Sequence, residues 1–134
     1  MPVSYQIDAA TGRVRTRCIG DVTLAEAVDH FRSLGLDPAT PLHPDVLVDL
    51  RETSSLPETD QLRSIAKEVA RLREKLQWGA CAIVASRDAV YGISRMFAVY
   101  TEDAFSSVRV FRELAEAEAW LEETRSPRAP AGAE

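Results

Sequence analysis

The stretch Asp45-Val46-Leu47-Val48-Asp49-Leu50-Arg51 lies in the middle of the chain and is short, apolar and rich in β-branched residues. Pro44 precedes it, and charged residues and serines follow from Glu52 onward. An apolar run of this length with these boundaries is typical of a strand that is buried on both faces of a largely parallel sheet. We therefore expect the other elements to be arranged as layers around this strand.

Length and composition favour a single domain with an ordinary hydrophobic core. The chain has 134 residues, of which 46% are hydrophobic, so a core forms without disulfides or metals. A net charge of −5 argues against general binding to nucleic acids or anionic membranes, since both need a basic surface. No apolar run approaches the roughly 20 residues of a membrane span. The N-terminal residues do not resemble a signal peptide.

The two cysteines, Cys18 and Cys81, both lie within apolar, strand-like runs. We interpret them as buried, reduced thiols, which is the usual state in the cytoplasm. A disulfide or a redox pair is the alternative. Together with the missing signal peptide, this interpretation predicts a cytoplasmic protein.

Strand and helix patterns alternate along the chain. Residues 4–8 and 13–20 predict a β-hairpin, and the second run places Arg13, Arg15 and Arg17 on one face. Thr23 and Glu26 have the spacing of a capping box before a helix. Apolar spacing predicts that further helices span residues 60–78, 89–101 and 113–124, and that strands span 80–86 and 107–111. Residues 125–134 are rich in Pro, Ala and Gly, and we expect a disordered tail.

The resulting order is ββαβαβαβα, which predicts an α/β fold. Strand–helix alternation implies right-handed crossovers and a sheet covered by helices. The opening hairpin adds an antiparallel strand, so we expect a mixed sheet of about five strands covered by about four helices. Residues 1–124 form the predicted domain.

Several strings in this order resemble the SpoIIAA-like family, a branch of bacterial STAS-like domains related to anti-sigma-factor antagonists. The matching strings are Tyr5-Gln6-Ile7-Asp8 with Gly12, Gly20-Asp21-Val22-Thr23-Leu24, Val48-Asp49-Leu50-Arg51, Val90-Tyr91-Gly92-Ile93-Ser94-Arg95-Met96 and Val108-Arg109-Val110-Phe111. The resemblance extends from about Val3 to Leu121. It implies a compact STAS-like domain with a regulatory or binding role and no known chemistry.

The resemblance also implies where a phosphorylation switch would lie. In the antagonists, a strand ending in Asp-Leu is followed by a serine motif that opens a helix, and a partner kinase phosphorylates one serine. That position falls here in Pro57-Glu58-Thr59-Asp60, where Glu58 takes the place of the serine and Asp60 that of a glycine. We therefore predict that the switch is absent, although Ser54, Ser55 and Thr59 provide nearby hydroxyl groups.

The sequence contains no recognisable catalytic or metal-binding motif. A nucleophile needs an oriented base, and the only histidines are His30 and His43. His30 falls on the flank of its predicted helix away from the apolar stripe, so we expect a surface histidine. No HxxxH or CxxC spacing and no GxGxxG or Walker loop occurs, so we expect no metal and no cofactor.

One group of polar residues is expected at the edge formed by the carboxyl ends of the strands. Arg51 and Arg87 each follow a buried strand, Asp88 begins the next helix, and Tyr91 and Arg95 lie one turn apart on it. Ligands of open α/β sheets bind at such an edge, near a switch in strand order. We call these five residues the strand-end edge and predict that it binds an anion or docks a partner. The alternative is that Arg51 and Arg95 form structural ion pairs with nearby acids such as Asp49, Asp88 and Glu52.

The function predicted from the sequence is that of a non-catalytic, cytoplasmic, STAS-like regulatory module that binds another protein or a second copy of itself. The alternative is a carrier of a small molecule or lipid, with an apolar pocket between the helix at 89–101 and the sheet, near Met96, Phe97 and Tyr100. A pocket of at least roughly 300 Å³ would favour the carrier. An unrecognised enzyme is a third reading.

Overall fold

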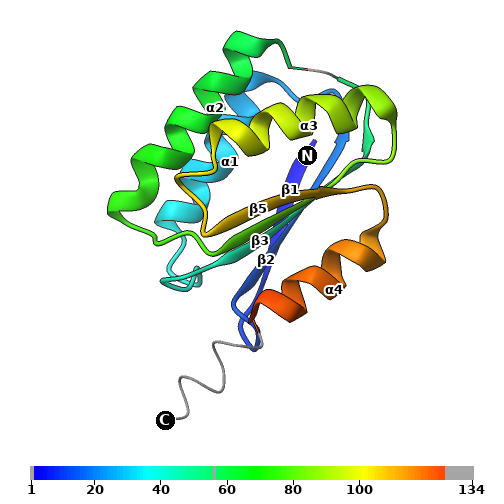
Figure 1. Ribbon diagram of the computed structural model, residues 1–134. Helices are drawn as coiled ribbons and strands as arrows, with labels where there is room; N and C mark the ends of the chain where they lie inside the picture. The colour runs from blue at the N-terminus through cyan, green and yellow to red at the C-terminus, as the bar shows by residue number, and fades with distance from the viewer. Residues whose placement is uncertain (1, 56, 126–134) are drawn as a thin grey trace.

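The computed structural model describes residues 2–55 and 57–125 and has the predicted element order (Figure 1). The strands are β1 (Val3–Asp8), β2 (Arg13–Gly20), β3 (Asp45–Thr53), β4 (Ala80–Val84) and β5 (Ser107–Phe111). The helices are α1 (Leu24–Leu36), α2 (Thr59–Arg71), α3 (Asp88–Tyr100) and α4 (Leu114–Arg125), with a 3₁₀ turn at Leu72–Glu74. The predicted mixed α/β fold is confirmed, and the predicted tail falls outside the described residues from 126 onward.

The five strands form one sheet in the order β1-β2-β3-β4-β5, so each strand pairs with its neighbour in the chain. The β1–β2 pair is antiparallel, and the other pairs are parallel. Because right-handed crossovers in one direction place their helices on the same side, α1, α2 and α3 all cover one face. Of the described helices, α4 alone covers the other face (Figure 1). The order of the five described strands never reverses, so this sheet lacks the expected switch point.

The core is divided by the sheet into two layers. The larger layer, beneath α1, α2 and α3, contains Val46 and Ile83, and the smaller layer, beneath α4, contains Leu47 and Val84. This division follows from the alternation of side chains along each strand. Val48 pairs with Ile83 in the β3–β4 register. The two apolar strands predicted at residues 45–51 and 80–86 are therefore neighbours in the sheet.

Both cysteines are buried and free, as predicted. Burial raises the pKa of Cys18 to about 11 and that of Cys81 to about 12. Since the thiolate is the reactive form, these two thiols are inert at neutral pH.

The second helix is shorter than predicted. It ends at Arg71 rather than near Trp78, and its N-cap residue is Glu58. The backbone beyond the 3₁₀ turn forms hydrogen bonds with the segment between α1 and β3 instead. The Gly79 N–H donates to the Pro44 carbonyl at 2.8 Å. This path brings Trp78 into the core, where its Nε1 donates to the Val69 carbonyl at 2.9 Å.

Gly79 stands where two chain segments approach too closely for a side chain. A Cβ atom there would lie 2.2 Å from Asp45 Oδ1 and 3.0 Å from the Pro44 carbonyl oxygen. Asp45 is buried, and its Oδ1 accepts from the Ala80 N–H at 2.9 Å, so it has little freedom to move. We expect Gly79→Ala to lower the free energy of unfolding by about 1–3 kcal/mol, measured by urea titration.

Gly92→Ala is the matched control for this substitution. A Cβ atom at Gly92, on an exposed part of α3, would meet no atom within 4 Å. Alanine there is expected to stabilise the helix by up to about 1 kcal/mol. If the Gly79→Ala variant is as stable as the unmodified protein, the chain at Gly79 does not lie as close to Pro44 and Asp45 as described.

Candidate functional site

Three residues of the strand-end edge, Arg51, Arg87 and Asp88, form side-chain hydrogen bonds with other residues of the protein. The Arg51 guanidinium makes two hydrogen bonds to Asp49, from Nε to Oδ1 at 2.9 Å and from Nη2 to Oδ2 at 2.8 Å. Arg87 donates to the carbonyl oxygen of Thr53 at the end of β3. Asp88 accepts from Arg112 Nη1 at 2.8 Å.

The hydrogen bonds that Arg51 donates to Asp49 raise the pKa of Arg51. Burial acts to raise the pKa of Asp49, but the hydrogen bonds from Arg51 outweigh it and the pKa lies below its ordinary value. Arg51 therefore forms the structural ion pair with Asp49 that the sequence analysis gave as the alternative to ligand binding.

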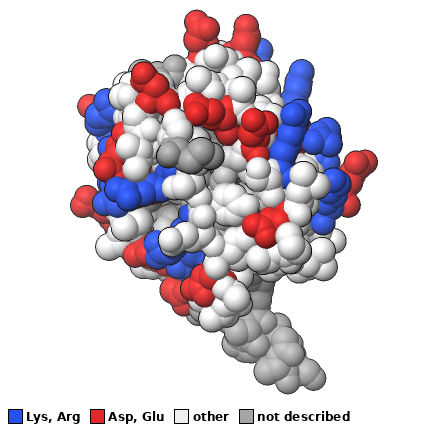
Figure 2. Space-filling view, turned by 180° about the vertical axis from the view of Figure 1, so that it is seen from behind, with Lys and Arg blue, Asp and Glu red and all other residues white. Residues whose placement is uncertain are grey.

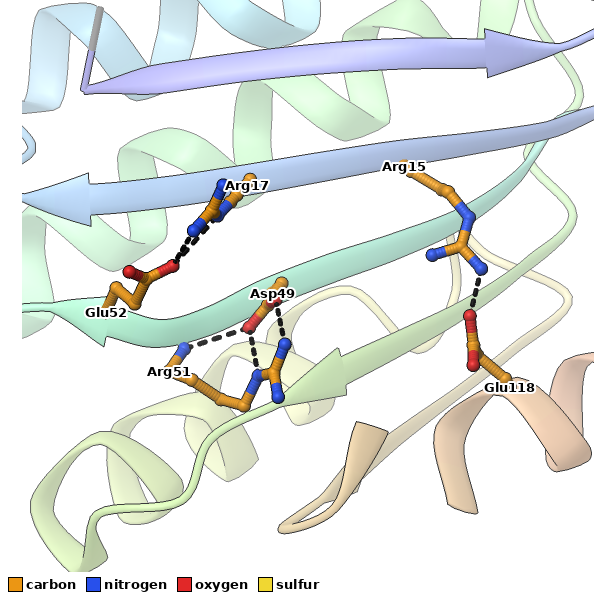
Figure 3. A network of polar contacts seen from close by, with 6 residues as sticks. All are labelled: Arg15, Arg17, Asp49, Arg51, Glu52 and Glu118. Carbon is orange, nitrogen blue, oxygen red and sulfur yellow. Dashed lines mark hydrogen bonds and ion pairs between the residues drawn. The ribbon is translucent and has the colours of Figure 1, made fainter. Parts of the chain in front are cut away.

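The edge residues are divided among three places. Arg51 points to the face of the sheet that α4 partly covers, on the same side as the β2 arginines (Figure 3). Arg87 reaches the end of β3, whereas Asp88 and Tyr91 lie at the start of α3 beside Arg112, whose guanidinium lies 4.3 Å from the Tyr91 ring centroid. Tyr91 and Arg95 together line a groove between α3 and β5. Whether any of these five residues binds a ligand or a partner stays a prediction.

The groove has a volume of about 450 Å³ and follows the open edge of the sheet. Its lining residues are Tyr91, Arg95, Ala98, Val99, Glu102, Val108, Arg109 and Val110. Val99 is 61% exposed. Within residues 2–55 and 57–125, the Arg95 side chain forms no hydrogen bond or ion pair. The sequence reading found Tyr91 and Arg95 but not Val99, because the sequence does not show which side of α3 faces the open edge of β5.

The predicted arginine face of β2 is paired with acidic residues. Arg15 pairs with Glu118 of α4, and Arg17 Nε donates to Glu52 Oε1 at 2.8 Å (Figure 3). Arg13 Nη2 donates to Glu122 Oε2 at 2.9 Å. Seen from behind, acidic and basic side chains are interspersed, and neither sign covers the face (Figure 2). The exposed pairs of Arg15 and Arg17 contribute little to stability, whereas the Arg13 side chain is buried. Acidic partners accompany all three arginines, so this face of β2 does not present positive charge alone.

The loop at the position of the antagonist switch is held by hydrogen bonds. The Glu58 N–H donates to Gln61 Oε1 at 2.9 Å, and Thr59 is the first residue of α2. Ser54 Oγ donates to Asp21 Oδ1 at 2.9 Å, while Ser55 Oγ accepts from the Val22 N–H at 2.9 Å. The serine hydroxyls thus tie this loop to the segment before α1. The absence of a phosphorylation switch stays a prediction.

A cavity of about 140 Å³ lies in the larger core layer, between the sheet and helices α1, α2 and α3. It extends to the carboxyl ends of β2 and β3, where Val22, Thr53 and Ser55 line it. Several lining positions carry small side chains, among them Thr16, Cys18, Ala27 and Ser94. None of the described lining residues is Asp, Glu, Lys or Arg. Phe97 lines the cavity as the predicted pocket required, but Met96 and Tyr100 do not.

His30 is buried beside this cavity, and the prediction of a surface histidine is wrong. The side chain is 8% exposed, its Nε2 lies 3.1 Å from Thr16 Oγ1, and its ring packs between Tyr5 and Phe31. His30 lies against Thr16 of β2 and Tyr5 of β1, so the buried surface of α1 is wider than the apolar stripe in the sequence. Burial lowers the pKa of His30 to about 4, so the imidazole is neutral at pH 7.

Two buried polar atoms at the cavity-lining residues have no hydrogen-bond partner in the described part of the chain. They are Nδ1 of His30 and Oγ of Ser94, and Ser94 is 3% exposed. Cys18 and His30 both line the cavity, but burial raises the pKa of the thiol and lowers that of the imidazole. An activated pair needs the opposite shifts, which produce a thiolate and an imidazolium. Residues 2–55 and 57–125 contain no group of three or more His, Cys, Asp or Glu suited to a metal ion.

Comparisons with known proteins agree with this architecture. No protein-family model and no curated protein matches the sequence. A solved structure of an uncharacterized DUF3478-family protein from Shewanella loihica PV-4, described as having a SpoIIAA-like fold, is similar, with a TM-score of 0.55 and 14% sequence identity. The match covers 89% of this chain and 91% of that protein. None of the described helices is long and apolar enough to span a membrane. The resemblance expected from the sequence is therefore confirmed for the fold, and the chain has a SpoIIAA-like fold.

Proposed function

We propose that this domain is a non-catalytic, cytoplasmic regulatory module that binds an extended acidic segment of another protein along the α3–β5 groove. The observation that supports the proposal is the combination of the edge strand β5, the exposed Val99 side chain and Arg95, which has no hydrogen-bond or ion-pair partner among the described residues. The neutral Cys18 and His30 in the core support a role without catalysis.

The backbone of β5 offers the first part of the binding surface. In the described sheet β5 pairs only with β4, so its outer N–H and C=O groups face no other strand (Figure 1). An exposed edge of this kind accepts an additional strand, and the backbone hydrogen bonds supply affinity. We therefore expect the partner segment to be extended.

The side chains on the two sides of β5 favour an acidic segment. A strand added beside β5 would place alternate side chains toward α3 and toward α4. On the α3 side they meet Arg95 and Val99. On the α4 side they meet Arg109, whose guanidinium lies 5.0 Å from the Phe111 ring and 5.9 Å from the Trp120 ring. Arginine binds carboxylates through a planar fork, so acidic residues complement both sides.

The test uses the full chain, tagged in its native host, with mass spectrometry of co-purifying proteins and measured affinities for the purified partner. We expect Arg95→Glu combined with Val99→Glu to weaken the partner about tenfold or more, because the variant places like charges in contact and removes apolar surface. The matched control is Lys67→Glu with Ala70→Glu on the exposed side of α2, which should leave the affinity unchanged.

Two results would contradict this proposal. Loss of the partner with Arg51→Ala and Arg87→Ala, but not with the groove variant, would locate docking at the strand-end edge. A dimer in analytical ultracentrifugation that the groove variant dissociates would identify a second copy of the chain as the occupant.

A further inference from the structure

We infer that the cavity beneath α1, α2 and α3 binds an uncharged organic molecule of about one aromatic ring that carries one hydroxyl or carbonyl group. This site is separate from the groove, and the inference does not depend on the proposed docking function. It rests on the size of the cavity, the chemistry of its walls and two unpartnered polar atoms.

The volume limits the ligand to a single ring. At about 140 Å³ the cavity is close to the apolar cavity of about 150 Å³ that holds one benzene molecule in an engineered protein. Pockets for larger, drug-sized ligands begin at roughly 300 Å³. A lipid acyl chain therefore lacks room, and the carrier expected from the sequence is restricted to small compounds.

The walls select an uncharged ligand. The described lining contains no Asp, Glu, Lys or Arg, and most of it is aliphatic or aromatic, including Phe31, Leu62 and Ile83. Burying an ion without a partner of opposite charge has a large desolvation cost. An anion or cation of the same size is therefore expected to stay in water.

Two polar atoms favour a ligand with a hydrogen-bonding group. Nδ1 of His30 and Oγ of Ser94 are buried beside the cavity on two different helices, and neither has a partner in the described part of the chain. Most buried polar atoms are paired, and leaving one unpaired is destabilising. A hydroxyl or carbonyl group on the ligand would supply the missing partner, so binding such a ligand removes an existing cost.

The cavity is also placed where a ligand can enter. Its outer end lies at the carboxyl ends of β2 and β3, beside the first turns of α1 and α2, and exposed Thr23 lines it there. Ligand sites of open α/β sheets lie at this same edge. The small side chains of Ala27 and Ser94 keep the space open, because larger residues at these helical positions would occupy it.

The experiment is a titration of the isotope-labelled full chain with three probes, followed by the shifts of backbone amide signals in NMR spectra. Phenol is a ring with one hydroxyl group, toluene has a similar shape without a polar group, and benzoate is an anion. We expect phenol to shift amides of the lining residues with an affinity about tenfold higher than that of toluene. Benzoate should not shift them.

Variants distinguish the contribution of a hydrogen bond to the ligand from that of the cavity volume. Ser94→Ala should reduce the advantage of phenol over toluene, whereas Ser64→Ala, on the exposed side of α2, should leave it unchanged. Ala27→Leu should fill the cavity and abolish binding of both probes while the spectrum stays that of a folded protein. If Ala27→Leu does not fold, the Ser94→Ala comparison decides. The inference is overturned if no probe shifts the lining amides, if benzoate binds as well as phenol, or if Ser94→Ala leaves the phenol preference intact.

Discussion

Replacing Ile83 with alanine is expected to lower the free energy of unfolding by about 2–5 kcal/mol. Ile83 is 2% exposed on β4, in the central strand pair, and belongs to the larger core layer. It also lines the cavity, so truncation enlarges an existing space that the neighbouring side chains do not fill. Urea titration measures this loss. The free energies of the variant and the unmodified protein can be compared directly if both depend on urea concentration with the same slope.

Ile19→Ala provides the control for this prediction. Ile19 lies near the end of β2 and is 43% exposed, so the same change of side chain removes far less buried surface. We expect an effect below about 1 kcal/mol there. A similarly small effect at Ile83 would mean that β4 is not a buried central strand.

Acidification from pH 6.5 to pH 4 is expected to remove roughly 3 kcal/mol of stability through His30. Burial lowers its pKa from 6.5 to about 4, so between these values the unfolded chain binds a proton that the folded chain does not. The contribution is therefore fully present above pH 6.5 and is lost as the pH falls toward 4. The hydrogen bond from Arg71 lowers the pKa of Glu68 from its usual 4.5, so this carboxylate begins to lose its contribution only as the pH falls below about 4.5.

Urea titrations at several pH values between these limits, repeated on two histidine variants, check this prediction. His30→Gln removes the buried imidazole and should make stability nearly independent of pH in this window. His43→Gln changes an exposed histidine and should preserve the loss. Stability that is constant in the unmodified protein down to about pH 4.5 would show that His30 is protonated without cost.

The layers of the fold were predictable because they depend on local patterns. The apolar runs around Val46 and Ile83 identified the central strands, since strands buried on both faces lack alternation. Burial of His30 was not predictable, because it depends on Tyr5 and Thr16 of the hairpin packing against a flank of α1 that the sequence of α1 alone shows as polar. The edge residues were also separated in space, since Arg51 and Arg87 end neighbouring strands but their side chains reach different partners. The cavity depends on the combined volumes of side chains from four strands and three helices, and no single segment encodes it.

The consecutive strand order has a consequence for how the chain folds. The two strands of each parallel pair are consecutive in the chain and are joined by a single helical crossover. No described strand therefore pairs with a distant part of the sequence. Short closures cost less chain entropy than long ones, and a lower contact order is associated with faster folding. We expect this sheet to grow by successive addition of β–α units from either side of β3, with little time spent as a partly paired and aggregation-prone intermediate.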